Sequence, residues 1–250
     1  LSGDLFTVAD YVPTLKTAKS LYWGANEGLH KIETTIGPVR KAGVPPALDT
    51  DAYISGTSGG VAPNSQAAYR VVFGRKDANA ITHLSAPSDV VLVANTNRSS
   101  TTLSLATGTN VLTVTDSGNG LSNGDIIYLY NVVSNDSPAD GSSVAVTGVT
   151  GTTFTFDFDD LGVAPSGVTS LEYGTRKTGT VYASIPSEIT STEYFYQVYR
   201  SESVDAAVIP DARYKLVEQV QLTAADIARG FVVYVDELPF EIIQSNAELY

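Results

Sequence analysis

The stretch Tyr194-Phe-Tyr-Gln-Val-Tyr-Arg200 decides the fold, because aromatic and β-branched residues dominate it. Such side chains fit the pleated, half-buried surface of a β-strand. Runs of the same character lie on both sides of it, and no long amphipathic helix pattern occurs in the chain. These runs are Thr180-Val-Tyr-Ala-Ser-Ile185, Tyr214-Lys-Leu-Val-Glu-Gln-Val-Gln221 and Gly230-Phe-Val-Val-Tyr-Val235. The sequence therefore predicts an all-β protein.

One short helical turn is expected between the last two of these strands. Thr223 and Asp226 have the spacing of a capping box, in which the two side chains satisfy the first free amide groups of a helix. Gly230 follows, and glycine commonly ends a helix because it accepts a left-handed backbone conformation.

Two upstream runs, Tyr69-Arg-Val-Val-Phe-Gly-Arg75 and Asp89-Val-Val-Leu-Val-Ala94, have the same strand character. A break at Ala86-Pro-Ser88 separates them. Together with the later strands they predict an antiparallel sandwich of the fibronectin or immunoglobulin type, built from residues 64–96 and 175–237.

Residues 97–174, between these two parts, have a different composition that is rich in Thr, Ser, Gly and Val and nearly free of Lys and Arg. Short strands recur there at even spacing with turn residues between them, which is typical of a small barrel. We expect this segment to fold as a small β-barrel inserted into the sandwich. The expected strands are 109–115, 126–130, 144–149 and 152–158.

The two ends of the chain are expected to belong to a larger body. In residues 1–63, Ser20–Ala25 and Leu29–Ile32 predict a β-hairpin, and Asp51–Pro63 reads as a Gly- and Ser-rich linker. Residues 238–250 are expected to lead out of the sandwich. Because the sequence opens at Leu1 and contains no methionine, we expect it to be a fragment of a longer protein.

Composition limits the classes of function. The hydrophobic fraction of 43% and the charged fraction of 17% are those of a globular protein. The absence of cysteine excludes a disulfide scaffold, a thiolate zinc site and a cysteine nucleophile. A net charge of −12 argues against a grip on nucleic acid, although an acidic surface suits DNA that must pass without being held. No signal-peptide layout and no apolar run of about 20 residues occurs, so we expect a soluble protein.

Candidate catalytic and metal-binding residues are few. His30 and His83 lack companions at the spacing of a metal site or a catalytic triad, so we interpret both as ordinary strand or loop residues. The acids of Asp157–Asp160 could bind a hard cation, but the loop glycine and terminal glutamate of a calcium-binding hand are missing. Asp136–Gly141 also lacks a ladder of ligands. We therefore expect no catalytic, cofactor-binding or metal-binding residue and no cofactor.

Three further patterns have simpler explanations. Gly118-Asn-Gly120 and Gly124 suggest a phosphate loop, but a β-rich run follows them where a helix would be required, so turns are expected. Asn97-Arg-Ser99 and Asn135-Asp-Ser137 match the glycosylation triplet, which arises often by chance. On the strand at 194–200, alternation puts one pair of aromatic side chains on each face, and we expect one face in the core and one against a partner. The pairs are Tyr194 with Tyr196 and Phe195 with Tyr199.

Residues 109–158 contain an apolar strand at Val111–Val114, an Asn119-Gly-Leu121 turn, the Gly124-Asp125 pair and the Thr153-Phe154 dipeptide. This pattern resembles the small β-barrel module that recurs in phage virion proteins and is related to the first catalytic-cysteine half-domain of ubiquitin-activating enzymes. Asn119 stands where histidine is common. The loop at 135–141 is longer than usual. No catalytic role follows from the resemblance, because the chain has no cysteine.

Two other parts of the chain resemble podovirus tail proteins. Tyr69–Gly74 with Tyr196–Arg200 looks like their fibronectin-type sandwich. Leu21–Gly28 and Arg40–Pro46 look like the propeller-edge and linker segments of tail tube or nozzle proteins. The resemblance implies a virion protein that forms a homo-oligomeric ring, commonly six-fold, beside adaptor and tail neighbours, with DNA only as passing cargo. It implies function by assembly and not by chemistry.

Two other readings stay open at this point. The chain can be an adhesin or a carbohydrate-binding accessory region of a surface protein or glycosidase, since similar sandwiches serve there and fold alone does not determine function. It can also be part of an enzyme whose catalytic domain lies outside this sequence. Under the phage reading, residues 1–49, which include Trp23, are too short for a core of their own and are expected to pack on other residues.

Overall fold

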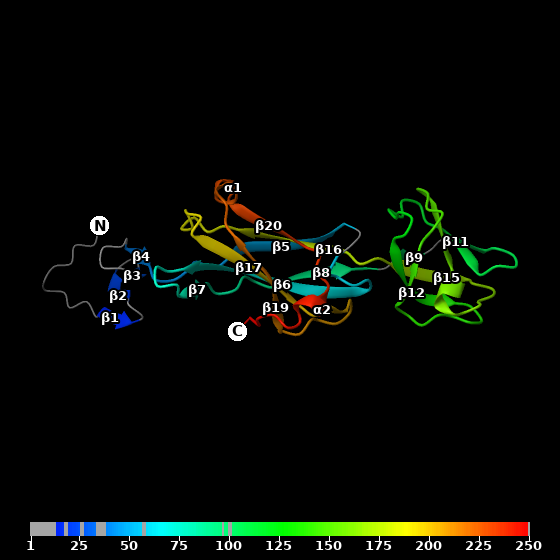
Figure 1. Ribbon diagram of the computed structural model, residues 1–250, viewed down its shortest axis with the longest axis horizontal. Helices are drawn as coiled ribbons and strands as arrows, with labels where there is room; N and C mark the ends of the chain where they lie inside the picture. Colours follow the sequence, from blue (N-terminus) through cyan, green and yellow to red (C-terminus); the bar gives the residue numbers. More distant parts are fainter. Residues whose placement is uncertain are drawn as a thin grey trace.

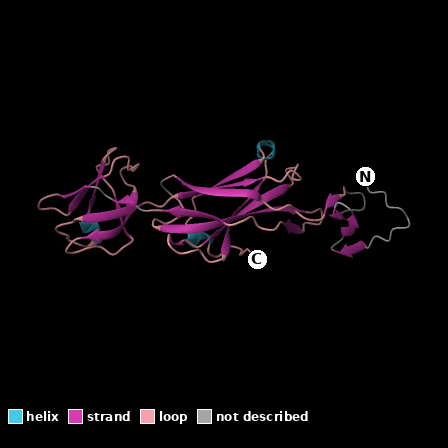
Figure 2. Cartoon of the chain, turned by 180° about the vertical axis from the view of Figure 1, so that it is seen from behind, coloured by secondary structure: helices cyan, strands magenta, loops and turns pink. Residues whose placement is uncertain are grey.

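The computed structural model describes residues 14–17, 20–25, 28–33, 39–56, 59–96, 98–99 and 102–249. Nearly all regular structure in this part of the chain is antiparallel β-sheet, as the sequence predicts. Figure 1 shows three bodies in a row: a small N-terminal sheet, a central sandwich and an insert at the far end. The view from behind in Figure 2 shows the same order. The molecule is therefore elongated.

The sandwich consists of two facing sheets. The first has the strand order β20 (Phe231–Asp236), β16 (Thr178–Ser184), β5 (Leu48–Ser55). The second is built around the long strand β6 (Ser65–Lys76), which pairs with β17 (Tyr194–Ser201) and β18 (Val204–Asp205) on one edge. Strands β7 (Thr82–Leu84) and β8 (Val91–Asn95) pair with its other edge, and β19 (Tyr214–Gln221) pairs with β17.

Both faces of β6 are buried, which explains its nearly unbroken apolar sequence. One face, with Tyr69, Val71 and Phe73, points into the core between the two sheets. The other face, with Ala68 and Val72, packs against Tyr199 of β17, Tyr214 of β19 and Leu249.

Two of the expected boundaries are wrong. The strand β5 occupies the first part of the stretch predicted to be a linker, residues 51–55, and Val61 beyond it is fully buried in the sandwich core. The segment expected to leave the sandwich instead folds back on it. Its short helix α2 (Phe240–Ile243) places Ile243 in the core, and Leu249 donates a backbone hydrogen bond to the carbonyl of Tyr214. The sandwich thus includes chain from both predicted end segments.

A helix α1 (Ala224–Arg229) forms where the capping signal predicts it. The hydroxyl of Thr223 accepts from the amide of Asp226, and the Asp226 carboxylate accepts from the amide of Thr223. Gly230 ends the helix at φ 81°. Because this turn is short, the chain reverses directly from β19 into β20.

The insert has two sheets of its own, and none of its strands pairs with a strand of the sandwich. One sheet has the order β10 (Thr102–Leu105), β11 (Val111–Thr115), β14 (Thr153–Asp157). The other has the order β13 (Ser142–Ala145), β12 (Ile126–Val133), β15 (Ser170–Gly174), β9 (Arg98–Ser99).

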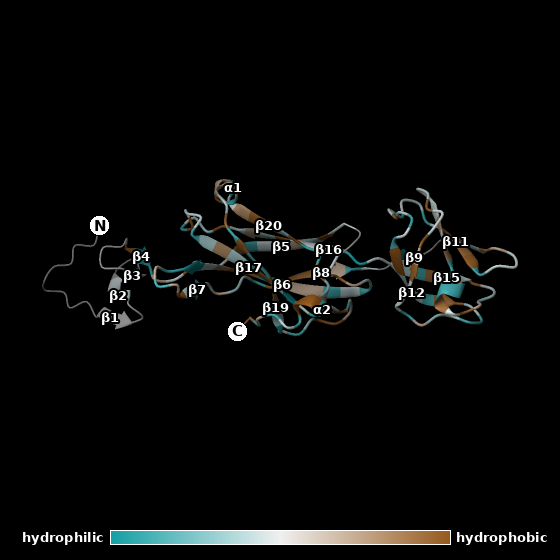
Figure 3. Cartoon of the chain, in the orientation of Figure 1, coloured by the Kyte–Doolittle hydropathy of each residue, from teal (hydrophilic) through white to brown (hydrophobic). Residues whose placement is uncertain are grey.

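These two sheets of the insert do not close into a barrel, although a bridge between Thr147 and Thr155 joins them on one side. The space between them holds a separate apolar core. Phe154 packs edge-on against Tyr173 with ring centroids 4.9 Å apart, and Phe156 packs likewise against Phe158 at 5.0 Å. In Figure 3 the strand β11 shows the brown of hydrophobic residues beside more polar loops.

The N-terminal body is a four-stranded antiparallel meander in the order β1 (Thr14–Thr17), β2 (Ser20–Ala25), β3 (Gly28–Ile32), β4 (Arg40–Lys41). It contains the expected hairpin, with Trp23 opposite His30, and adds one strand on each side. We call it the meander below.

The insert is expected to be removable without unfolding the sandwich. Asn95, where β8 ends, donates hydrogen bonds to the carbonyls of Val61 at 3.1 Å and Thr175 at 2.8 Å, so the chain leaves and re-enters the sandwich at neighbouring points. Replacing residues 97–174 with a short Gly-Ser loop should leave the NMR signals of β6 and β17 dispersed and near their original positions. Collapse of those signals would contradict an independent insert.

Candidate interaction site at the meander

The meander is joined to the sandwich by a largely buried cluster of four charged side chains and one histidine, which we call the ionic joint: Lys31, Glu33, Arg75, Asp77 and His83. Lys31 of β3 donates to Asp77 Oδ2 at 2.7 Å, and its side chain is 0% exposed. Its ammonium also lies 2.8 Å from His83 Nε2 on β7. These contacts of Lys31 tie strand β3 of the meander to the second sheet of the sandwich.

A second ion pair lies beside the first. Arg75, near the end of β6, donates to Glu33, and Glu33 also accepts from the amide of Ala78 at 3.1 Å. The loop that carries Asp77 is held in turn by its own backbone, since the amides of Asn79 and Ile81 both donate to Asp77 Oδ1. A buried pair contributes only when each charge has such additional partners, and here both carboxylates have them.

The electrostatics of the ionic joint favour the charged forms of both carboxyl groups. Burial alone would raise the pKa of Asp77, but hydrogen bonds from Lys31, His83 and two backbone amides outweigh burial and hold this pKa well below its usual range. Burial would likewise raise the pKa of Glu33. The hydrogen bond from Arg75 and the amide of Ala78 lower it by more.

An open cleft of about 580 Å³ lies beside the ionic joint. Its lining combines apolar side chains with a basic pair: Leu29, Val44, Pro45, Tyr194, Arg40, Lys41, with Gly43 and Glu188. Arg40 of β4, one of the lining residues, pairs with Glu193 at 2.8 Å. The cleft is therefore formed by both bodies and depends on their relative placement.

Within the part of the chain that the structure describes, the meander contributes no residue to any of the three apolar cores. Trp23 is buried at 7% exposure and stacks on His30 with centroids 5.8 Å apart, yet Leu29 remains 55% exposed and Leu21 39%. A sheet with so little buried apolar surface is not stable alone. The ionic joint holds it, and exposed apolar side chains are left on it.

The structure places the two histidines differently. His30 lies in the meander against Trp23, whereas His83 belongs to the ionic joint and is more than an ordinary strand residue. Sequence reasoning missed the joint because Lys31 lies 46 positions from Asp77 and 52 from His83. No local pattern signals a contact over such separations.

The acidic clusters of the insert form no metal site among the described residues. Asp157 caps the 3₁₀ turn at Phe158–Leu161 by accepting from the amide of Asp159, and Asp159 accepts from Asn110. Asp136 and Asp140 each accept from a backbone amide of the insert. These acids mainly shape turns.

The remaining patterns are also structural. The glycines at 118, 120 and 124 have φ values of 71°, 68° and 90°, so they provide the left-handed conformations that turns require. Asn97 lies outside the described residues. Asn135 accepts from the amide of Ser166 within a loop of the insert.

On β17 both aromatic faces are covered by this chain. Tyr196 lies in the core between the sheets, and Tyr199 packs under Tyr214 and Leu249 on the other face. Phe195 is 3% exposed and lies against Gly74, where a Cβ would come within 2.3 Å of its ring. The chain itself thus covers these three aromatic side chains, whereas the fourth, Tyr194, is half-buried and lines the cleft.

A different aromatic group is exposed on the outer face of the first sandwich sheet. Tyr53 of β5 stacks on Tyr182 of β16 at 5.6 Å, and Tyr182 lies 6.1 Å from Phe231 of β20. The hydroxyls of the two tyrosines are 2.9 Å apart, and the guanidinium of Arg229 lies 4.7 Å from the Phe231 ring centroid. We call this row the aromatic ladder. It depends on cross-strand register, which the sequence alone does not give.

Comparison of the chain with protein-family models, with curated proteins and with solved structures found no match. No helix among the described residues is long and apolar enough to cross a membrane.

Removing one charge from the ionic joint should loosen the meander. In Asp77→Asn, the buried Lys31 loses its nearest counter-charge, and we expect docking to weaken by about 2 kcal/mol, less than for an unpaired buried charge because Glu33 remains 3.7 Å from the Lys31 ammonium. Hydrogen exchange of the Ala78 amide, which donates across the joint, measures this change.

The matched control is Asp211→Asn, which removes a pair to Arg213 whose side chains are 72% and 78% exposed. Such a pair contributes little, so exchange at Ala78 should not change. Equal effects of the two substitutions would contradict a stabilising role for the joint.

Acid should release the meander before it unfolds the sandwich. The pKa values of Asp77 and Glu33 are lowered in the folded state, so their stabilisation is complete above the ordinary carboxyl range near about pH 4 and is lost as the pH falls below it. NMR relaxation of β3 amides should then report faster independent tumbling while β17 remains ordered. Loss of order in β3 and β17 at the same pH would refute this order of events.

Proposed function

We propose that this chain is a non-enzymatic structural component of a phage virion, a tail tube or nozzle ring subunit that surrounds the DNA channel and acts by assembly. The observation that carries the proposal is the meander. It has no apolar core among the described residues, yet the ionic joint fixes it to a sandwich that has a complete core.

The apolar core of such a body can be completed by a neighbouring polypeptide. A four-stranded antiparallel meander is the shape of one propeller blade, and a blade gains its core only from neighbouring blades. The exposed Leu29 and Leu21 supply apolar surface for such a neighbour. The resemblance to tail proteins adds the expectation of a homo-oligomeric ring, commonly six-fold, next to adaptor and tail proteins.

The charge of the chain supports passage of DNA and not its capture. With a net charge of −12, a ring of copies would repel a phosphate backbone over most of its surface. Such a lining lets DNA move without strong binding. Catalysis is no part of the proposal.

The aromatic ladder favours a second candidate, an adhesin or a carbohydrate-binding accessory region. Tyr53 is 47% exposed, and its hydroxyl lies next to that of Tyr182. An exposed aromatic ring with hydroxyl groups at its edge suits sugar binding. The ladder rings stack mainly on one another, which leaves fewer free ring faces for a sugar. For this reason we place the structural virion role first.

Antibody labelling of intact particles tests the proposal. An antibody against the insert, applied to purified virions whose genome encodes this chain, should decorate the tail in electron micrographs. Unlabelled virions together with labelled bacterial surfaces would reject the virion role. Glycan binding that is lost in Tyr53→Ala and retained in Tyr128→Ala would then establish the second candidate.

A further inference from the structure

We infer that copies of this chain associate head to tail, with the cleft beside the ionic joint of one copy receiving the acidic insert of a second copy. This inference rests on the proposed assembly function and names the surface that would serve it. It is carried by the opposite charge and opposite positions of the two ends of the molecule.

The charge of the chain is distributed unevenly along the sequence. Residues 14–41, which span the meander, contain five Lys or Arg and only two Asp or Glu. Residues 97–174, which make up the insert, contain eight Asp or Glu and one basic residue, Arg98. Figures 1 and 2 place the meander and the insert at opposite ends of the long axis. Two of the five basic side chains, Lys31 and Arg40, are paired with acids of the sandwich. The meander therefore carries a small excess of positive charge, and the insert is the strongly acidic end.

The cleft is the receiving surface because it combines free basic charge with apolar side chains. Lys41 is exposed and makes no ion pair with any residue that the structure describes, while Arg40 beside it is held by Glu193. Leu29, at 55% exposed, and the half-buried Tyr194 supply the apolar part of the lining. Removal of these apolar side chains from water on binding would stabilise the contact in addition to the attraction between charges.

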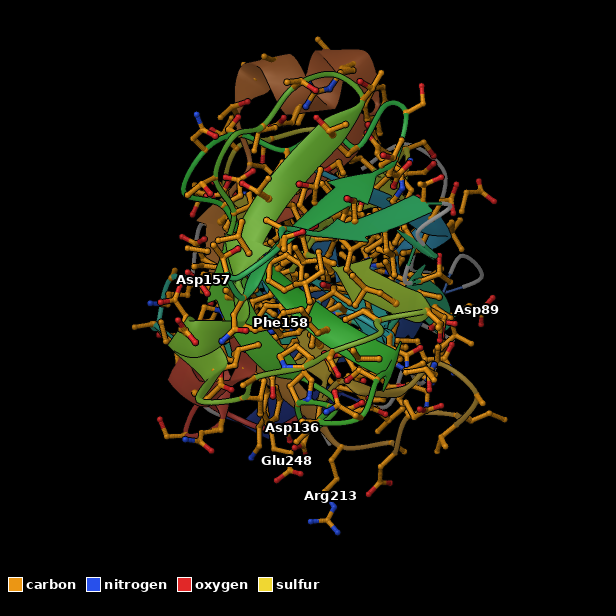
Figure 4. All side chains as sticks on the ribbon, turned by 90° about the vertical axis from the view of Figure 1, so that its right-hand side faces the viewer. Asp89, Asp136, Asp157, Phe158, Arg213 and Glu248 are labelled. Atoms are coloured by element: carbon orange, nitrogen blue, oxygen red, sulfur yellow. The ribbon has the colours of Figure 1, made fainter. Side chains whose placement is uncertain are left out.

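The acidic end offers a matching surface on its 3₁₀ turn. Asp157 fixes the start of this turn, so Asp160 and the half-buried Leu161 are held on a rigid support. Asp160 is exposed and forms no hydrogen bond or ion pair with the described residues. Figure 4, which views the molecule from its insert end, shows Asp157 and Asp136 on this end.

An interface of this kind is heterologous, because two different surfaces meet. Repetition of one heterologous contact gives a ring when the rotation between copies closes, and an open filament when it does not. A symmetric dimer that joined like ends would bring two acidic inserts or two basic meanders together, which like charges disfavour. An antiparallel two-fold pair would satisfy both charge contacts at once, so a closed dimer is the competing form that the experiment distinguishes. A ring is the form that the proposed tail role requires.

Strand pairing between copies is a weaker route to assembly. The exposed edge strand β5 carries a bulge, at which Asp49 adopts a left-handed φ of 47°, and a second acid, Asp51. Bulges and charges on edge strands oppose pairing with another sheet. The end-to-end contact is therefore favoured over lateral sheet extension.

A charge swap tests the contact with the whole chain. The chain should form species larger than dimers by mass photometry at low salt, and these should dissociate as salt screens the attraction. Lys41→Glu and Asp160→Lys should each weaken association about fivefold, as expected for a rim charge pair, and combining the two in one chain should restore it.

Asp89→Lys is the control, because it reverses an exposed acid of the sandwich and should leave association within about twofold of the original. Monomers at every concentration, closed dimers, or failure of the double substitution to restore association would overturn the inference. Tail labelling combined with any of these outcomes would leave the virion role standing and place the interface elsewhere.

Discussion

One buried ion pair crosses between the two sheets of the sandwich and constrains how they face each other. Arg200 of β17 donates to Asp236 of β20, and Tyr69 of β6 donates to the same carboxylate at 2.8 Å, with the side chains of both charged partners 0% exposed. This arrangement fixes the distance between sheets. A Cβ on Gly179 would come within 2.4 Å of the Tyr69 hydroxyl, and one on Gly60 within 2.0 Å of Arg200. Removing one partner would leave an uncompensated buried charge, which is far more costly than losing a surface pair.

Much of the fold could be predicted because its strongest elements carry local signals. The strands at 194–201 and 214–221 are dense in aromatic and β-branched residues, and α1 has a complete capping box. The strand β5 could not be predicted in the same way. Its sequence Leu48-Asp-Thr-Asp-Ala-Tyr-Ile-Ser55 has two acids and a bulge, and it is a strand because β16 pairs with it. Tertiary pairing overrode a weak local preference.

The ionic joint was beyond sequence reasoning for a related reason. Lys31, Asp77 and His83 come from a meander strand, a loop and a short edge strand, and each looks like an ordinary surface residue in its local sequence. Only the packing of one body on the other buries them. The aromatic ladder is similar, since Tyr53, Tyr182 and Phe231 meet through diagonal neighbours in a register set by the whole sheet.

The two kinds of contact in this chain have different consequences for its use. Apolar cores are the main support of the sandwich and the insert, whereas charges hold the meander. Apolar contacts tolerate small shifts, but a hydrogen-bonded ion pair requires a particular geometry and so fixes orientation. Since the joint uses the polar side chains of the meander, exposed apolar residues such as Leu29 remain free for another surface. A rigidly oriented body with unused apolar surface is what an assembly subunit needs to present to its neighbour.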